Sequence, residues 1–166
     1  MSSPILHTYP YQVNGSSSFV DFRTAKILIV AKYSGTDLKI EESCVIGEDG
    51  KLSEELLKKC PLGKIPSLQL GSSSKTQVIG EANAAAYFLA NDELKGGVDD
   101  EIKRAQVLQW MNFAEVDLIP VTYNWVFPIL GLMKSKEEGE SLEKLLELLR
   151  KLDNHLGLFG CCHFVF

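Results

Sequence analysis

Residues 63–68, with Lys64, Ile65 and Pro66 at their centre, form the segment best suited to binding an extended ligand. They lie between a predicted helix and a predicted hairpin, and a proline at the start of an edge strand is compatible with a cis peptide bond. A cis bond would turn the Ile65 backbone outward, so that its N–H and C=O could pair with an extended peptide. The alternative is a trans edge proline that only blocks aggregation, and spacing alone favours this alternative.

A second candidate site is the start of an alanine-rich helix, where Gly80 is followed by Glu81, Ala82 and Asn83. The unpaired N–H groups at a helix N-terminus attract anions, including the carboxylate of a ligand. Glu81 could equally be a first-turn acid that offsets the helix dipole without any ligand. For Glu81 taken alone, this simpler interpretation is favoured.

Several hydroxyl groups accompany the first predicted strand, namely those of Thr8, Tyr9, Tyr11 and the serines 16 to 18. A hydroxyl placed over the thiol of a ligand could donate a hydrogen bond to the thiolate and lower its pKa. The alternative is a partly buried aromatic residue and a solvated loop. No Ser–His–Asp or Cys–His arrangement is indicated, because the three histidines lie near the ends of the chain (His7, His155 and His163).

The four cysteines predict free thiols rather than disulfides or a metal site. Cys44 and Cys60 stand alone, Cys161 and Cys162 are adjacent, and no C-x-x-C motif occurs. The last pair and His163 could be imagined as metal ligands, but structural zinc takes four ligands, usually in spaced pairs. We therefore expect no metal site.

Four aromatic residues gather in the second half of the chain: Trp110, Phe113, Trp125 and Phe127. Such residues dominate both hydrophobic cores and protein interfaces. We expect most of them to lie in the core, with a contact between subunits as the alternative.

The composition is that of an ordinary soluble globular protein, with 45% hydrophobic and 23% charged residues among 166. Lysine and arginine number 17 against 22 aspartates and glutamates, and no basic run offsets the net charge of −5. A direct role in binding nucleic acid is therefore not expected. No apolar run approaches the length of about 20 residues that spans a membrane, and no signal peptide is visible. These features predict a cytoplasmic protein.

The elements predicted for the first half alternate between strand and helix. Strands are expected at residues 5–8 and around Leu38 and Ile40, a helix at 53–59, a hairpin at 65–70 and 76–79, and a helix at 81–90. Residues 23–33 fit either a buried strand or a helix, and residues 11–19 are polar and turn-like. With a helix at 23–33, this order is a βαβ unit followed by ββα, which makes a small mixed sheet covered by helices.

The second half, from residue 99, is predicted to be entirely helical. A helix at 102–119 follows three acids and meets Pro120, which must kink or break it, and Pro128 interrupts the next apolar run at 123–133. Residues 134–139 form a charged connector, and Ser141 can cap the last helix. Leucines at 142, 145, 146, 149, 152 and 156 form one apolar stripe on that helix.

Two groups of motifs resemble known families. The Gly-Lys-Ile-Pro string at 63–66, the Glu-Ala-Asn-Ala-Ala-Ala-Tyr string at 81–87 and the helical second half resemble the glutathione transferase fold. Residues 106–115, 117–120 and 125–131 are similar to the gamma-subunit family of eukaryotic translation elongation factor one, as are residues 6–10, 31–35 and 91–94. The Trp-Val-Phe-Pro-x-Leu-Gly string at 125–131 is fairly specific to that family, whereas Gly-Lys-x-Pro is common to many transferase-like domains.

The resemblance implies an α/β part followed by an all-α part. A thioredoxin-like βαβ-ββα half would occupy 1–91, a linker 92–98, and an incomplete glutathione-transferase-type helical half 99–156. The family's helical half continues into a buried helix introduced by a Thr-x-x-Asp capping motif, which has no counterpart here. Residues 157–166 form an apolar, atypical tail instead. We interpret the sequence as a truncated or alternatively spliced form.

The resemblance also assigns a glutathione-like site, residue by residue. Ile65 and Pro66, with Lys64 beside them, would anchor the cysteinyl part of glutathione, while Glu81 and Ala82 would face its γ-glutamyl end. Transferases carry serine after that glutamate, and the loss of its hydrogen bond to a charged group costs about 1.5–3 kcal/mol. Tyr9 lies in the region of the activating hydroxyl. The site is therefore interpreted as a weakened or vestigial one.

The function implied by the resemblance is a non-catalytic scaffold that binds the guanine-nucleotide-exchange subunit of the elongation factor one complex. No cofactor is required, glutathione is left open as a ligand, and homodimerisation is left open as well. The alternative is a glutathione transferase that conjugates glutathione to small electrophiles. A third interpretation, the transferase-like appendage of an aminoacyl-tRNA synthetase complex, is disfavoured by the string at 125–131.

Overall fold

The computed structural model describes residues 3–8, 11–12, 18–19, 21–42, 52, 54–60, 62–71, 76–131 and 138–157. The chain divides into two compact units, Met1–Arg104 and Ala105–Phe166. The four-part division inferred from the sequence, with its boundary near residue 91, stays a prediction.

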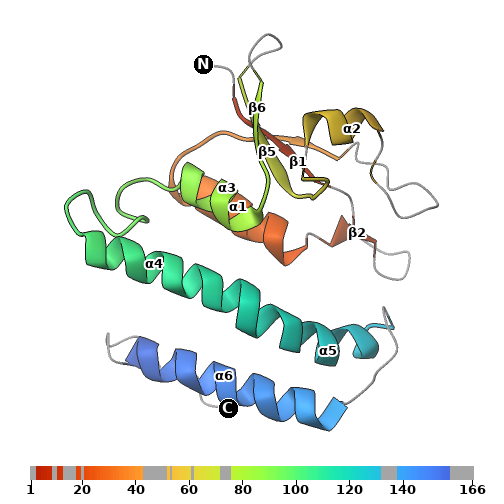
Figure 1. Cartoon of the computed structure of the whole chain (residues 1–166), viewed down its shortest axis with the longest axis vertical. Coiled ribbons are helices and arrows are strands. Elements are labelled where there is room, and N and C mark those ends of the chain that lie inside the picture. The colour runs from red at the N-terminus through yellow and green to blue at the C-terminus, as the bar shows by residue number, and fades with distance from the viewer. Residues whose placement is uncertain are drawn as a thin grey trace. The chain divides into compact units, whose positions relative to one another are not determined.

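The first unit is built on a four-stranded mixed sheet with the order β4-β1-β5-β6 (Figure 1). Strand β1 (Ile5–His7) pairs in parallel with β4 (Lys39–Glu41) and antiparallel with β5 (Ser67–Leu70), which pairs antiparallel with β6 (Gln77–Ile79). Helix α1 (Phe22–Tyr33) joins β1 to β4, α2 (Glu54–Lys59) precedes β5, and α3 (Ala82–Leu89) follows β6. The predicted order of βαβ followed by ββα is confirmed.

Helices α1 and α3 lie side by side (Figure 1), and small residues between them allow a close approach. Ala31 of α1 and Ala85 of α3 are both almost completely buried. At one end Lys26 Nζ donates to Asn83 Oδ1 over 2.6 Å, and at the other the Asn91 N–H donates to Ser34 Oγ over 3.1 Å. The two helices therefore run parallel.

Two sequence expectations for this unit change. The ambiguous segment at 23–33 is a helix. Within residues 11–19, described from the sequence as polar and turn-like, β2 (Tyr11–Gln12) and β3 (Ser18–Phe19) pair as a separate two-stranded sheet. A two-residue strand is too short to show the alternation of apolar and polar residues that identifies a strand. The polar residues at the centre of the segment therefore led to the prediction of a turn.

Helix α1 begins at a side-chain cap. One carboxylate oxygen of Asp21 accepts hydrogen bonds from the N–H groups of Arg23 and Thr24, at 2.9 and 3.2 Å. Replacing Asp21 by alanine is expected to lower the free energy of unfolding by about 0.5–2 kcal/mol, because two helix-end donors lose their partner. Urea denaturation followed by circular dichroism measures the loss. Asp21→Asn keeps a capping oxygen and should lose much less, so an equal loss in both variants would contradict the capping role.

In the second unit, the backbone changes its helical form before Pro120. Helix α4 (Glu101–Phe113), which starts in the first unit, leads into a π-helix (Ala114–Leu118), labelled η1, and then into α5 (Ile119–Ile129). The Ile119 N–H donates to the Ala114 carbonyl, five residues back. Pro120 has no N–H to donate, and it sits in the first turn of α5, where none is required. The predicted interruption of the helix is therefore a π-helical turn.

Pro128 does not interrupt the apolar run, contrary to expectation. It lies inside the last turn of α5, which ends one residue later. Gly131 follows with φ of +70°, the left-handed conformation in which helices commonly end. The chain terminates α5 at this glycine rather than at the proline.

Helix α6 (Glu138–Gly157) packs its apolar side against α5. Val121, Leu145 and Leu148 are its buried centre, and Phe113, Leu118, Trp125 and Leu149 pack around them. The expected cap at Ser141 is wrong, because α6 begins three residues earlier. On the exposed side, Lys151 Nζ lies 2.7 Å from Glu147 Oε1, and this hydrogen bond lowers the pKa of Glu147.

Among the described helices, none is both long and apolar enough to cross a membrane.

Candidate functional site

The peptide bond between Ile65 and Pro66 is cis, whereas spacing alone favoured trans. The first paired residue of β5 is Ser67, so the Ile65 backbone precedes the ladder that joins β5 to β1 and β6. The Pro66 ring is buried, and the Ile65 side chain packs against the buried Cys60. These contacts hold the segment just before β5, which pairs with β1 on one side and β6 on the other. The expectation that Pro66 begins an edge strand is therefore wrong, because the hairpin adds β6 outside β5.

Glu81, the residue just before α3, has an unusual backbone conformation. Its φ of +68° lies where L-residues are rarely found, and no other described non-glycine residue has a positive φ. Its carbonyl accepts the first hydrogen bond of the helix, from the Ala85 N–H at 3.0 Å. Its side chain does not cap the helix.

The Glu81 carboxylate is instead paired with Lys64. Lys64 Nζ lies 2.5 Å from Glu81 Oε1, so the structure brings together two residues that the sequence indicated separately. Both side chains are at least half exposed, and an exposed pair of this kind contributes only about 0–1 kcal/mol. A ligand could therefore displace this pairing at little cost.

The next residue, Ala82, is buried and supplies only a methyl group. The site therefore combines backbone groups at Ile65, the N-terminus of α3 and one paired carboxylate, with no hydroxyl at position 82. Such an arrangement can bind an extended, peptide-like ligand through the backbone, but it holds a ligand carboxylate poorly. The assignment of Lys64, Ile65, Pro66, Glu81 and Ala82 to a glutathione-like site stays a prediction.

Replacing Glu81 by glycine is expected to raise the free energy of unfolding by about 1 kcal/mol. A strained backbone conformation costs about 1–3 kcal/mol, which glycine relieves, while its greater freedom in the unfolded chain offsets about 0.5–1 kcal/mol. Lys64→Ala removes the ion pair and leaves the backbone unchanged, so it should lower stability by less than about 1 kcal/mol. Urea denaturation of both variants distinguishes the effects. A Glu81→Gly variant less stable than Lys64→Ala would show that the backbone is not strained.

The hydroxyl of Thr8 cannot serve a ligand thiol. Thr8 Oγ1 and Thr24 Oγ1 are 2.9 Å apart and both residues are buried. Thr24 gives its single hydroxyl proton to Asp21 Oδ2, so Thr8 must donate to Thr24. Among the other candidates, Tyr9 and the serines 16 and 17 lie outside the described residues, as do the side chains of Tyr11 and Ser18.

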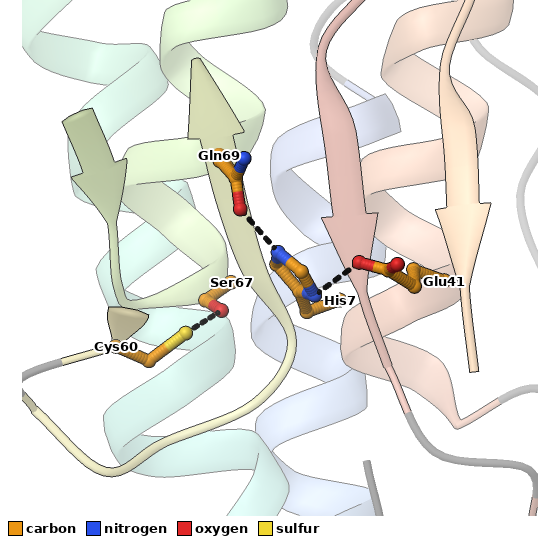
Figure 2. A network of polar contacts seen from close by, with 5 residues as sticks. All are labelled: His7, Glu41, Cys60, Ser67 and Gln69. Atoms are coloured by element: carbon orange, nitrogen blue, oxygen red, sulfur yellow. Dashed lines mark hydrogen bonds and ion pairs between the residues drawn. The ribbon is translucent and has the colours of Figure 1, made fainter. Parts of the chain in front are cut away.

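A buried polar network crosses the sheet and was not anticipated from the sequence. In Figure 2, His7 lies between Glu41 and Gln69, which come from the strands on either side of β1. The His7 ring is buried, with Nδ1 3.1 Å from Glu41 Oε2 and Nε2 2.9 Å from Gln69 Oε1. A second pair, Cys60 Sγ and Ser67 Oγ, is 2.8 Å apart. No sequence motif indicates His7, because strand register alone brings these residues together.

The four aromatic residues all belong to the second unit. Phe113 and Trp125 pack around its core, and Trp110 meets Phe113 edge to face at 5.4 Å and His155 at 4.1 Å between ring centroids. Phe127 contacts the ring of Tyr123 at 4.3 Å. Trp110 and Phe113 also line a cavity of about 600 Å³ together with Gln109, Asn112, Val116, Asp117 and Lys151. Whether any of the four contacts another subunit stays a prediction.

Within the described part of the chain, no three His, Cys, Asp or Glu side chains lie close enough to hold a metal ion. Cys161, Cys162 and His163, the ligands considered from the sequence, lie outside the described residues.

No family model matches the chain. Three of its sequence relatives are named elongation factor 1-gamma. The protein from Artemia salina is 40% identical over 153 residues, that from Drosophila melanogaster 36% over 151, and that from Rattus norvegicus 32% over 160. These alignments cover 91–94% of this chain, which spans about a third of the length of the relatives, 32–33%.

Solved structures show the same fold. The glutathione-transferase-like domain of elongation factor 1-gamma from Saccharomyces cerevisiae matches 95% of this chain and 68% of that domain, with a TM-score of 0.62 and 21% identity. A glutathione transferase from Bombyx mori matches 93% of this chain and 66% of its own, with a TM-score of 0.71 and 20% identity. The expected fold class, a thioredoxin-like half followed by helices of the transferase type, is confirmed.

Proposed function

Because this chain is a homologue of elongation factor 1-gamma over nearly its whole length, we propose that it is a non-catalytic scaffold of the translation elongation factor one complex. The observation that carries the proposal is the 40% identity over 153 residues to the Artemia salina protein. In this proposal the chain acts in the cytoplasm and binds the guanine-nucleotide-exchange subunit. Its role is to hold that subunit, and the exchange chemistry belongs to the partners.

The geometry of the glutathione-like site supports a scaffold more than an enzyme. Glu81 is paired with Lys64, Ala82 has no hydroxyl, and Thr8 gives its proton to Thr24. Stabilising a thiolate requires a donor aimed at the sulfur. The missing hydroxyl at position 82 weakens binding of a glutathione carboxylate, and the Thr8 hydroxyl is not available to a ligand thiol. The exposed Lys64–Glu81 pair favours neither function. The likeness to transferases at 20% identity shows the fold alone, so the transferase alternative is not favoured.

The test is to mix the purified chain with the exchange subunit of elongation factor one and to measure the mass of the complex by light scattering after size exclusion. We expect a complex of defined mass. In parallel, the chain is incubated with glutathione and an electrophilic chloronitrobenzene, and we expect no turnover above the uncatalysed rate.

The opposite pattern would overturn the scaffold proposal. A cooperatively folded chain that forms no complex and conjugates glutathione, at a rate that falls in Glu81→Gln, would establish the transferase. The light-scattering mass of the chain alone also reports whether it forms a homodimer.

A further inference from the structure

Helix α1 has an apolar stripe that faces away from its own core. Its buried residues are Thr24, Ile27 and Ala31. Phe22, Ile29 and Tyr33, here called the outer α1 stripe, are 37%, 56% and 75% exposed. At about 100° per residue, positions 22, 29 and 33 fall on one line, on the side of the helix opposite the buried residues. Three large exposed side chains in line are more than the scattered apolar residues of an ordinary surface.

The charges that flank this stripe are all positive. Helix α1 contains Arg23, Lys26 and Lys32 and no acidic residue, although the whole chain carries a net charge of −5. The Arg23 guanidinium lies 5.0 Å from the centroid of the Phe22 ring, at the first residue of the stripe. Asp21, the acid just before the helix, accepts the hydrogen bonds of the helix cap.

The neighbouring helix α3 carries no charged residue between Ala82 and Leu89, and Glu81 stands at its N-terminus. Lys95, beyond the end of α3, lies 5.5 Å from the centroid of the Tyr87 ring. The basic residues beside the outer α1 stripe are therefore those of α1 itself. Along α1 itself, the surface is apolar in the middle and basic at its edges.

We propose that the outer α1 stripe is the surface on which this chain holds the exchange subunit, by docking an amphipathic helix whose apolar face is bordered by acidic residues. This inference rests on the proposed scaffold function. A line of side chains at helical spacing forms a ridge that fits the groove of a second helix. Acidic borders on the partner helix complement the basic side of α1, above all the exposed Lys32, whereas Lys26 is already bound to Asn83. Such complementarity speeds encounter and fixes the register of docking.

The experiment compares the wild-type chain with three variants, each titrated with the exchange subunit by isothermal calorimetry. Ile29→Asp places a charge in the middle of the stripe, and the dissociation constant should rise at least tenfold. Lys32→Glu reverses one flanking charge, and the constant should rise several-fold with a weaker dependence on salt. Ile102→Asp is the control, because Ile102 is 72% exposed in the first turn of α4 and is not part of the outer α1 stripe. The dissociation constant of this variant should not change.

Each outcome has one meaning. If the wild-type chain binds and both α1 variants bind equally well, the stripe is not the surface, while the scaffold function stands. If the wild-type chain does not bind, the scaffold function fails and this surface fails with it. If the chain alone is a dimer that Ile29→Asp converts to a monomer, a second copy occupies the stripe and the inference is overturned. If Ile29→Asp does not fold, the dissociation constant of Lys32→Glu still tests whether the outer α1 stripe binds the exchange subunit.

Discussion

Replacing Leu68 by alanine is expected to lower the free energy of unfolding by about 2–5 kcal/mol. Leu68 is completely buried in β5, where it lies opposite Leu6 of β1 and Ile79 of β6. Truncation there loses the transfer free energy of the side chain and leaves a cavity on the buried face of the sheet. Since whole domains are stable by only about 5–15 kcal/mol, this single change removes much of the total.

Urea denaturation monitored by circular dichroism measures the Leu68→Ala effect. Leu62→Ala is the matched control, because it deletes the same atoms from a side chain that is 61% exposed. We expect that control to change stability by no more than about 0.5 kcal/mol. Similar losses in the two variants would show that Leu68 is not part of a packed core.

Replacing His7 by alanine is expected to cost about 2–4 kcal/mol, although the residue has no assigned function. The change opens a cavity in the sheet and removes the hydrogen-bond partner of Glu41 and of Gln69 at once. Most of the expected loss comes from the cavity left by the buried ring, because the Glu41 side chain is 35% exposed and water can replace part of its lost hydrogen bond. Chemical denaturation of His7→Ala measures the total effect.

A double-mutant cycle isolates the contact between His7 and Gln69. The free energies of unfolding of His7→Ala, Gln69→Ala and the double variant are compared with that of the wild type. A coupling of about 0.5–3 kcal/mol is expected for residues that share a hydrogen bond. Additive losses would mean that His7 stabilises the sheet by its volume alone.

The order of the elements in the first unit could be predicted because each strand and helix has a local signal. Residues 23–33 remained ambiguous for a physical reason. Helix α1 is apolar on its buried side and also on the outer α1 stripe, so its sequence lacks the single apolar face by which an amphipathic helix is identified. The same feature that obscured the prediction is the one that indicates a docking surface.

The candidate site could be predicted only in part. Lys64 lies close to Pro66, and Glu81 lies at the start of a predicted helix. These local signals indicated both segments as candidate sites. Their pairing depends on how the hairpin between them folds back, which no local pattern encodes. His7 shows the same limit more strongly, since its partners are placed by the register of three strands.

Helix ends were the least predictable feature of the second unit. Ser141 is a good capping residue, yet α6 starts at Glu138, because packing of the leucines onto α5 stabilises helical turns beyond the local cap. Pro128 looked like a stop signal, but its position in the last turn of α5 lets the helix include it. In both cases tertiary contacts outweigh local propensity.

The π-helical segment Ala114–Leu118 works as a phase shift in the hydrophobic repeat. In an uninterrupted α-helix, side chains three or four positions apart share a face, yet Phe113 and Leu118 join the same core although they are five positions apart. The wider turn takes up the extra residue, so α4 and α5 follow two frames offset by one position. Deleting one of residues 114–118 would let the segment close as an ordinary α-helix and would leave Val121 and Trp125 in the same core. Keeping all five residues in α-helical geometry would instead rotate Val121 and Trp125 by about 100° away from that core. The π-helical turn is therefore what lets both flanking segments face one core, and a single helical period fitted across residues 101–129 does not detect it.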